Sequence, residues 1–338
     1  MVVLNSRSFK LLLKNIYRIF NAQIKSSVNE DISILVKLDN HPWNYLCECG
    51  DASDLTIKEI QDCNAIFISH THIDHFVNFD AVIRHQIGIE RRVVICGPEN
   101  ISKHVQARLK SYTWNLIQKG SIIYEIREVV SENKIVVYEI EPPFWELIKI
   151  GEQDNNILFE EKSFTVSSVI LDHKTPTLAY KFKENETLKI DIQKSGFKGG
   201  KWVKGLKDAF INKDNNAVIS IDEKDYQAHE LYHLLHIQEG DSVGVIMDHA
   251  ANHENHSKIK DHFWKCRQVF IESFYKEADQ ELAALNFHSF STQSGKIMSE
   301  TEVDEPIPVH FSRKYKEHDL KELMQEFESE AYKNKNPN

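Results

Sequence analysis

The chain has 338 residues, a length that suits one large domain or two ordinary ones and that can bury a sizeable core. Hydrophobic residues make up 41% and charged residues 27%, the composition of a globular protein and not of a disordered chain. The formal net charge of −10 argues against broad nucleic-acid binding, so any such binding would need a local basic patch. No stretch approaches the roughly 18 consecutive apolar residues of a membrane span, so we expect no membrane partner.

The segment at residues 6–25 mixes apolar side chains with lysines and arginines. It is not a secretory signal, because the basic residues interrupt its apolar part and no small-residue cleavage site follows. A basic helix on a membrane surface is one interpretation. We favour the other, an opening strand or helix of the core.

Five cysteines are present, an odd number, and no two of them form a CxxC pair. This pattern does not indicate a disulfide framework, so a reducing compartment fits best. We therefore expect a cytoplasmic protein.

Short runs of apolar, β-branched residues predict strands in chain order at 32–38, 65–69, 92–97, 163–171, 177–182, 217–221, 242–248, 268–273 and 307–312. Helices are predicted between them at 78–87, 99–118, 200–211, 224–236, 256–265, 276–285, 292–299 and 317–331. This alternation, without internal repeat or linker, indicates a single α/β domain over residues 1–338. We expect a short insertion rich in Lys and Gly at about 184–215 and a frayed tail at 332–338.

The stretch SHTHIDH at residues 69–75 follows a predicted buried strand and supplies four potential metal ligands. His70 and His72 would share one face of an extended segment, because side chains alternate with a period of two. Asp74 and His75 lie past the strand end, where a loop can turn them toward a second position. The spacing therefore predicts two adjacent metal sites. Imidazole and carboxylate ligands fit zinc, with manganese or iron as alternatives.

Each metal needs at least three protein ligands, so further ligands must come from later in the chain. His173, Asp248 and His310 each stand at or just after the end of a predicted strand. They form a consistent set with the first cluster.

The motif HTHIDH resembles that of the metallo-β-lactamase superfamily, and later segments resemble its ribonuclease Z branch. These segments are LDHKTPTLAYKF at 171–182, VIMDHA at 245–250, the stretch at 270–298 and VHFSRKY at 309–315. The resemblance runs in order from about residue 32 to residue 315. It implies the αββα four-layer sandwich of that superfamily, in which helices flank two mixed β-sheets.

The resemblance also implies roles for individual residues. One metal ion would be held by His70, His72 and His173, a second by Asp74, His75 and His310, and Asp248 would bridge the two. Asp74 would act as the base toward the attacking water. His288 would assist the leaving group, oriented by Glu272. The implied protein is a dinuclear metal-dependent phosphodiester hydrolase that cuts tRNA precursors at their 3′ side, and the family also suggests a homodimer.

Two other functions remain open at this point. One is a small-molecule hydrolase of the same fold acting on a cyclic nucleotide, another phosphodiester, a lactone or a thioester. The other is a non-catalytic binding protein, which loss of metal ligands would mark. The seven ligands are all present in this sequence.

The segment at 194–208 is the expected contact with RNA, because it combines lysines with aromatic residues and glycines. The alternative is a solvated helix start whose tryptophan packs on the core. The residues proposed here to bind substrate are Lys198, Lys201, Trp202 and Lys204, together with Arg313 of the VHFSRKY segment.

Two further histidine clusters have simpler interpretations. HELYH at 229–233 matches a zinc-protease pattern, but nothing downstream completes it, so we expect an amphipathic helix with exposed histidines. His249 adjoins Asp248 and could support the metal site or face substrate, whereas His253 and His256 are expected in a solvated loop.

Overall fold

The computed structural model describes residues 18–333. The chain divides into two compact units, one formed by the segments before residue 184 and after residue 240, the other by residues 184–240. The expectation for residues 6–25 falls partly outside the described residues. Its last part forms strand β1 (Phe20–Ile24), which pairs with β2 (Ile34–Leu38).

The first unit contains two large mixed sheets. Sheet A has the strand order β1-β2-β3-β4-β5-β6-β7-β8 and is parallel from β3 to β6. Its remaining strands are β3 (Asn44–Cys47), β4 (Cys63–Phe67), β5 (Arg92–Pro98), β6 (Ile123–Ser131), β7 (Lys134–Ile140) and β8 (Ile148–Gln153). Sheet B has the order β18-β17-β16-β11-β10-β9 and is parallel across β16, β17 and β18. Its strands are β9 (Ile157–Glu160), β10 (Phe164–Asp172), β11 (Pro176–Glu184), β16 (Ser242–Ile246), β17 (Gln268–Glu272) and β18 (Glu305–Val309).

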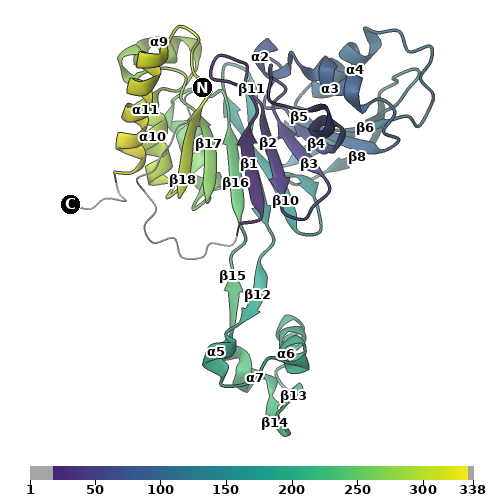
Figure 1. Ribbon diagram of the computed structural model, residues 1–338, viewed down its shortest axis with the longest axis vertical. Helices are drawn as coiled ribbons and strands as arrows, with labels where there is room; N and C mark the ends of the chain where they lie inside the picture. The colour runs from purple at the N-terminus through teal and green to yellow at the C-terminus, as the bar shows by residue number, and fades with distance from the viewer. Residues whose placement is uncertain (1–17, 334–338) are drawn as a thin grey trace. The chain divides into compact units, whose positions relative to one another are not determined.

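Helices cover the outer faces of the two sheets, which gives the four-layer sandwich expected from the sequence. Sheet A packs against α1 (Ile57–Gln61), α3 (Phe79–Gln86) and α4 (Ile101–Lys110). Sheet B packs against α8 (His253–Phe263), α10 (Ser291–Glu300) and α11 (Glu317–Ala331). Figure 1 shows α10 and α11 beside β17 and β18, and α3 and α4 beside β4 and β5.

Apolar burial between the layers holds this arrangement together. The layer between the sheets is built from alternate strand residues such as Phe67, Tyr180, Phe182 and Phe270, all at most 2% exposed. Burying an aromatic side chain of this kind contributes roughly 1.5–3 kcal/mol. The connections at one edge of the sandwich carry three short elements: α2 (Ile73–Phe76), the 3₁₀ turn η2 (Glu277–Asp279) and α9 (Gln280–Asn286).

The second unit has a small core of its own. It contains β12 (Thr187–Ile190), α5 (Ile192–Ser195), α6 (Lys201–Ile211), β13 (Val218–Ile221), β14 (Lys224–Gln227), α7 (Ala228–Leu231), η1 (Tyr232–Leu234) and β15 (Leu235–Gln238). β12 pairs with β15, and β13 pairs with β14, both antiparallel. Trp202, Leu206, Ile219, Leu231 and Leu234 are buried against one another. The insertion expected at 184–215 lies within this unit, which continues to residue 240.

Most predicted elements are present, and the differences have physical causes. The helix predicted at 224–236 is wrong: that segment is divided among β14, α7, η1 and β15. The helix predicted at 99–118 ends at Lys110. Strands β6 to β9 were not expected; in β6 and β8 charged residues interrupt the apolar ones on a partly exposed face. None of the helices within residues 18–333 is both long enough and apolar enough to cross a bilayer.

Candidate metal centre

The seven predicted metal ligands come together at one edge of the sandwich. His70 follows β4, and His72 is the N-cap of α2, whose first turn carries Asp74 and His75. His173 follows β10, Asp248 follows β16, and His310 follows β18. Because β16, β17 and β18 are parallel, their carboxyl ends open at the same edge. The strand-end positions seen in the sequence therefore become one cluster.

The ligand atoms form two groups that share Asp248. His70, His72, His173 and Asp248 offer atoms within 4.8 Å of one another, and so do Asp74, His75 and His310. One carboxylate oxygen of Asp248, Oδ2, lies 3.8 Å from His70 Nε2 and 3.5 Å from His173 Nε2. The other, Oδ1, lies 3.4 Å from His75 Nε2 and 2.9 Å from His310 Nδ1. Each oxygen of Asp248 thus faces a different group of histidines.

The polar atoms at the centre of the cluster lack hydrogen-bond partners. His70 Nε2, His75 Nε2, His310 Nδ1 and Asp248 Oδ1 are all buried and make no hydrogen bond, although the last two lie 2.9 Å apart as an ion pair. A buried polar atom without a partner is costly and uncommon in native proteins. Imidazole nitrogens and carboxylate oxygens in this arrangement are the donors that divalent transition metals prefer. The residues present therefore fit two divalent metal ions.

The electrostatics of the cluster favour a cation. Burial, together with the neighbouring charge of His75, lowers the pKa of His70 to about 2, so this imidazole is neutral. Burial would raise the pKa of Asp74, but its contact with His310 and the nearby charge of His75 outweigh that effect, and the pKa lies well below its usual range. Both Asp74 and Asp248, whose pKa is also lowered, are ionised. Burial would lower the pKa of His75 and of His310, but the charge of Asp248 outweighs it and raises both above the usual value, so these two imidazoles carry protons that offset the carboxylates. A divalent metal ion would take the place of those protons.

Further residues fix the orientation of the ligand histidines. Glu48 is fully buried, and its Oε2 lies 3.0 Å from His75 Nδ1. Its Oε1 accepts a hydrogen bond of 2.9 Å from the Ser69 backbone N–H, and Ser69 Oγ lies 3.0 Å from His70 Nδ1. His173 Nδ1 lies 2.6 Å from the carbonyl oxygen of Phe287. Partners of this kind set which imidazole nitrogen faces the metal. Sequence reasoning did not assign Glu48 or Ser69 a role, and the one signal was an acidic residue at a strand end in CECGD.

His288 and Glu272 form a hydrogen-bonded pair beside the cluster. His288 Nδ1 bonds to Glu272 Oε1 and lies 3.8 Å from Asp248 Oδ2. Burial lowers the pKa of His288, but the charge of Glu272 outweighs this effect and raises it above its usual value. Phe274 stacks on the His288 ring with centroids 3.9 Å apart. The imidazole is thus held in one plane, and its protonated form is favoured.

Both carboxylate oxygens of Glu272 accept hydrogen bonds. Oε1 bonds to His288, while Oε2 accepts hydrogen bonds from Ser289 N, Ser289 Oγ and the backbone N–H of His249. Glu272 could also join a metal group with Asp248 and His310. Because its oxygens are already engaged, we assign it to positioning His288.

The three histidines after Asp248 differ in their surroundings. His249 is fully buried, with Nδ1 2.8 Å from the Met247 carbonyl oxygen, so its place is behind the metal cluster. His253 is exposed as expected, but it is the first residue of α8 and does not lie in a loop. His256 lies within α8 and is half-buried, with Nδ1 3.1 Å from Gln293 Nε2, so the expected loop is here a helix.

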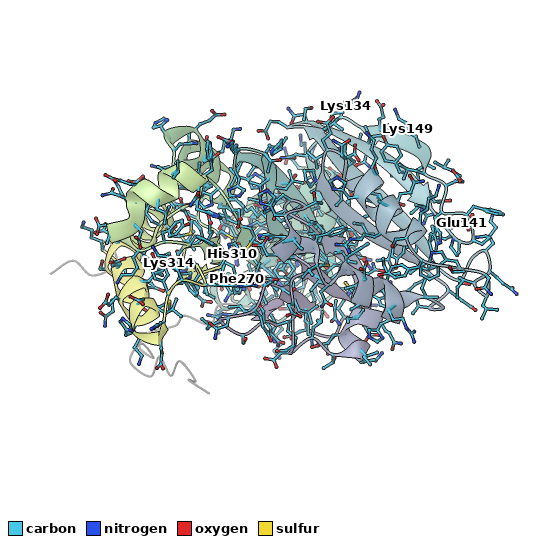
Figure 2. All side chains as sticks on the ribbon, turned by 90° about the horizontal axis from the view of Figure 1, so that it is seen from above. Lys134, Glu141, Lys149, Phe270, His310 and Lys314 are labelled. Carbon is cyan, nitrogen blue, oxygen red and sulfur yellow. The ribbon has the colours of Figure 1, made fainter. Side chains whose placement is uncertain are left out.

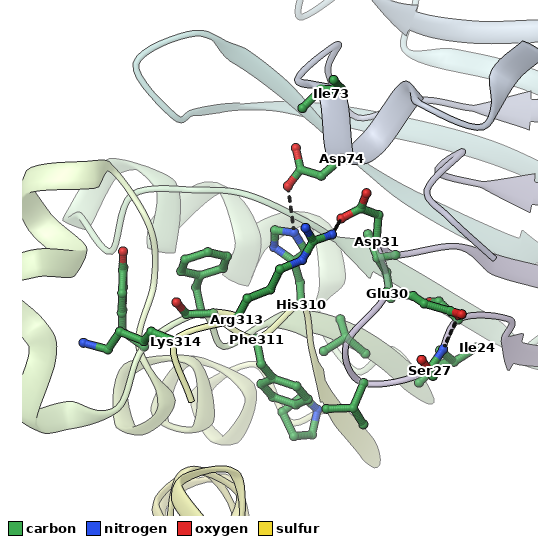
Figure 3. Close-up of a pocket in the computed structure, with 18 residues that line it drawn as sticks. Ile24, Ser27, Glu30, Asp31, Ile73, Asp74, His310, Phe311, Arg313 and Lys314 are labelled. Atoms are coloured by element: carbon green, nitrogen blue, oxygen red, sulfur yellow. Dashed lines mark hydrogen bonds and ion pairs between the residues drawn. The ribbon is translucent and has the colours of Figure 1, made fainter. Parts of the chain in front are cut away.

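A cavity of about 710 Å³ adjoins the cluster. Asp74 and His310 form one wall, and the segments 24–32 and 308–314 supply much of the rest (Figure 3). Arg313 lies in this cavity and forms an ion pair with Asp31. Viewed from above, His310 and Lys314 lie on the side of the C-terminal helices, whereas Lys134 and Lys149 lie at the β7–β8 edge (Figure 2).

The other predicted substrate residues lie in the second unit. Lys198, Lys201 and Lys204 are exposed. Trp202 is only 8% exposed, and its Nε1 donates a 2.8 Å hydrogen bond to the Lys198 carbonyl oxygen. Of the two interpretations open for Trp202, its surroundings are those of a core residue.

The HELYH segment does not have the geometry of a zinc-protease site. Helix α7 ends at Leu231, so His229 and His233 do not lie on one helix. Both side chains are exposed, and each Nδ1 lies within 2.9 Å of a backbone carbonyl oxygen, that of Asn215 or Glu230. Within the described residues of the second unit, no metal-binding group of side chains is found.

Comparison with solved structures defines the class of fold. The metallo-β-lactamase fold protein YhfI from Bacillus subtilis superposes with a TM-score of 0.52 at 10% identity, covering 91% of each chain. The short form of human tRNase Z (ELAC1) gives a TM-score of 0.54 at 13% identity, covering 87% of this chain and 93% of that one. The protein therefore has the metallo-β-lactamase fold, as the sequence predicts.

Comparison of sequences narrows the resemblance to one branch. A protein named ribonuclease Z from Deinococcus radiodurans is 24% identical over 290 residues, covering 82% of this chain and 85% of the relative. Other relatives with that name reach 27% identity. No family model matches the chain. The predicted resemblance to ribonuclease Z is confirmed.

Proposed function

We propose that the protein is a dinuclear metal-dependent phosphodiester hydrolase of the ribonuclease Z type, which cleaves tRNA precursors at their 3′ side. The observation that carries this proposal is the position of Asp248, whose two oxygens face two separate groups of histidine nitrogens. The ribonuclease Z relatives support it, because they match more than four fifths of the chain.

Each group of ligands would hold one ion. One ion would bind to His70, His72 and His173, a second to Asp74, His75 and His310, with Asp248 between them. When bound, two such ions lower the pKa of a water molecule and offset negative charge on a phosphoryl oxygen. Zinc suits this ligand set best, with manganese or iron as alternatives.

The chain's own residues would carry the protons. The ionised carboxylate of Asp74 accepts the proton of the attacking water. Glu272 holds Nδ1 of His288, so the proton on Nε2 of the imidazolium is the one offered to the departing oxygen. Stacking on Phe274 keeps the ring in place during this transfer.

Contacts to the RNA backbone would come from exposed cations. Lys198, Lys201 and Lys204 are exposed on the second unit and can reach phosphates. Trp202 would support them by fixing the Lys198 carbonyl, and not by stacking on a base. Arg313 would contact phosphate in the cavity beside Asp74 and His310.

We also propose that the protein works as a homodimer in the cytoplasm. All five cysteines are free and buried, which suits a reducing compartment. Light scattering on the purified protein tests the oligomeric state, and a monomer at micromolar concentration would contradict it.

The decisive experiment is cleavage of a 3′-extended tRNA precursor by the zinc-loaded protein. We expect a cut at the 3′ side that His72→Ala abolishes, since His72 is exposed and its loss need not unfold the chain. His229→Ala is the matched control, because this histidine is exposed and outside both ligand groups. No cleavage by the wild type, or cleavage that survives His72→Ala, would refute the proposal.

A second candidate is a small-molecule phosphodiesterase with the same centre. The observation that favours it is the acidic lining of the cavity, where Glu30, Asp31 and Asp74 would repel a polyanion. Turnover of bis(p-nitrophenyl) phosphate without cleavage of tRNA precursors would establish this alternative.

A further inference from the structure

The cavity beside the metal cluster is lined by both acidic and basic groups. Glu30, Asp31 and Asp74 line it together with Arg313 and Lys314, and His310 lies 3.4 Å from Asp74. Lys314 already has partners: its Nζ lies 2.8 Å from Asp279 Oδ1 and over the Tyr275 ring. Arg313 is therefore the cation best placed to meet a phosphate there, and it is bound to Asp31 instead (Figure 3).

The two partners of this ion pair are held to different degrees. The Asp31 side chain is 17% exposed, whereas that of Arg313 is 66% exposed. Asp31 is thus fixed in the wall, and Arg313 reaches to it from solvent. Exposed ion pairs contribute only about 0–1 kcal/mol, so a ligand can displace Asp31 at little cost. A phosphate can replace the carboxylate, because the guanidinium binds either one through two parallel N–H groups.

The ion pair with Arg313 also influences the charge of Asp31. Burial raises the pKa of Asp31, Arg313 lowers it, and the charge of Asp74 raises it again. Arg313 is therefore the neighbour that favours the charged form of Asp31.

We propose that Asp31 is a specificity-determining residue. It forms an ion pair with Arg313 in the free enzyme, and a substrate phosphate takes its place when substrate binds. Ligands without a phosphate in reach of Arg313 cannot make this exchange, so they find Arg313 still paired with Asp31. Substrates with a suitably placed phosphate gain the guanidinium. This inference rests on the proposed phosphodiester-hydrolase function and adds a selection step to it.

The test is a double-mutant cycle with the metal-loaded enzyme on a 3′-extended tRNA precursor. The four proteins are the wild type, Asp31→Asn, Arg313→Ala and the double variant. We expect Asp31→Asn to lower KM by about three- to five-fold, the change that release of one exposed ion pair supports. Arg313→Ala should raise KM, and Asp31→Asn should have no further effect in that background. The effects should fall on KM and not on kcat.

Salt dependence gives a second readout that a purely structural role would not change. The salt dependence of RNA binding should be at least as steep in Asp31→Asn as in the wild type. In Arg313→Ala the slope should drop by about 0.7–0.9, the range for one phosphate of a single or double strand. Asp51→Asn is the charge control, because Asp51 is an exposed neighbour that also raises the pKa of Asp31, whereas the ion-pair partner of Arg313 is Asp31 itself. We expect it to leave KM within error of the wild type.

Several results would overturn the inference. An unchanged or higher KM in Asp31→Asn, an equal drop in Asp51→Asn, or an undiminished effect of Asp31→Asn in the Arg313→Ala background would each do so. If the wild type does not cut RNA but hydrolyses bis(p-nitrophenyl) phosphate, the RNA proposal fails while the same four proteins test Asp31 on that substrate. No turnover of either substrate overturns both proposals.

Discussion

Replacement of Glu48 by glutamine should weaken metal binding although residue 48 touches no metal. The Glu48 carboxylate is fully buried and faces three donors: His75 Nδ1 at 3.0 Å, Ser69 N at 2.9 Å and Ser69 Oγ at 3.0 Å. A glutamine amide can keep the bond to one oxygen but must present an NH₂ group to the other side. If this NH₂ group faces His75, Nδ1 of His75 must accept its hydrogen bond. The imidazole proton is then on Nε2, the nitrogen that faces Asp248.

The size of the effect follows from this change of tautomer. Loss of such an orienting partner typically costs 10- to 100-fold in metal affinity, or about 1.4–2.7 kcal/mol. Glu48→Asp should lose less, because it keeps an acceptor for both partners. Zinc affinity is measured by competition with a chromophoric chelator, and metal content by elemental analysis after dialysis.

Glu128→Gln is the matched control. Glu128 is also a buried glutamate that accepts hydrogen bonds from a serine N–H and hydroxyl, those of Ser102, but it does not belong to the ligand groups. It should lower thermal stability without changing zinc affinity. If Glu48→Gln binds zinc as tightly as the wild type, or if both variants lose affinity equally, the tautomer argument is wrong.

Three further outcomes are expected. His288→Gln should lower kcat on a tRNA precursor by roughly 10²- to 10⁴-fold with metal content unchanged, the range for loss of a general acid; a pH–rate profile that keeps its alkaline limb in this variant would speak against the role. Replacing Lys198, Lys201 and Lys204 by alanine should weaken RNA binding and reduce its salt slope by about 0.7–0.9 for each phosphate that is no longer bound. The exposed pair Lys213→Ala/Lys224→Ala serves as control. Burial would raise the pKa of Glu59, but hydrogen bonds from Lys37, Thr56 and Lys25 lower it from 4.5 to about 2. Because the folded-state pKa is depressed, its contribution to stability is present above pH 4.5 and is lost as the pH falls toward 2; urea titrations should show a shallower acid limb for Glu59→Gln, and an identical limb would contradict this.

The ligand set could be predicted because each of its members carries a local signal. His173, Asp248 and His310 stand at or after continuous apolar strands, and parallel strands bring their ends to a common edge. The residues that orient them gave no comparable signal. Glu48 and Ser69 meet His75 and His70 through hydrogen bonds that depend on how β3 and β4 pair, and side-chain geometry of that kind is not encoded in a pattern.

Secondary structure was predicted wrongly in strands of which only one face is buried and in the small second unit. In the first half of β6, every second residue is partly exposed, and most of β8 is exposed, so charged residues break the apolar runs. The segment 224–236 has helical spacing, yet its apolar residues serve a compact unit of four short strands. There, tertiary packing outweighs local propensity.

The ligands of the metal cluster come from both sheets, and this has a consequence for folding. His70, His72 and Asp74 follow a strand of sheet A, whereas His173, Asp248 and His310 follow strands of sheet B. His70 and His173 are separated by about a hundred residues of chain, so an ion shared between them would close a long loop in the way that a cross-link does. Removal of the metal should therefore loosen the sandwich along its seam between the two sheets, and hydrogen exchange should rise at β4 and β16 together.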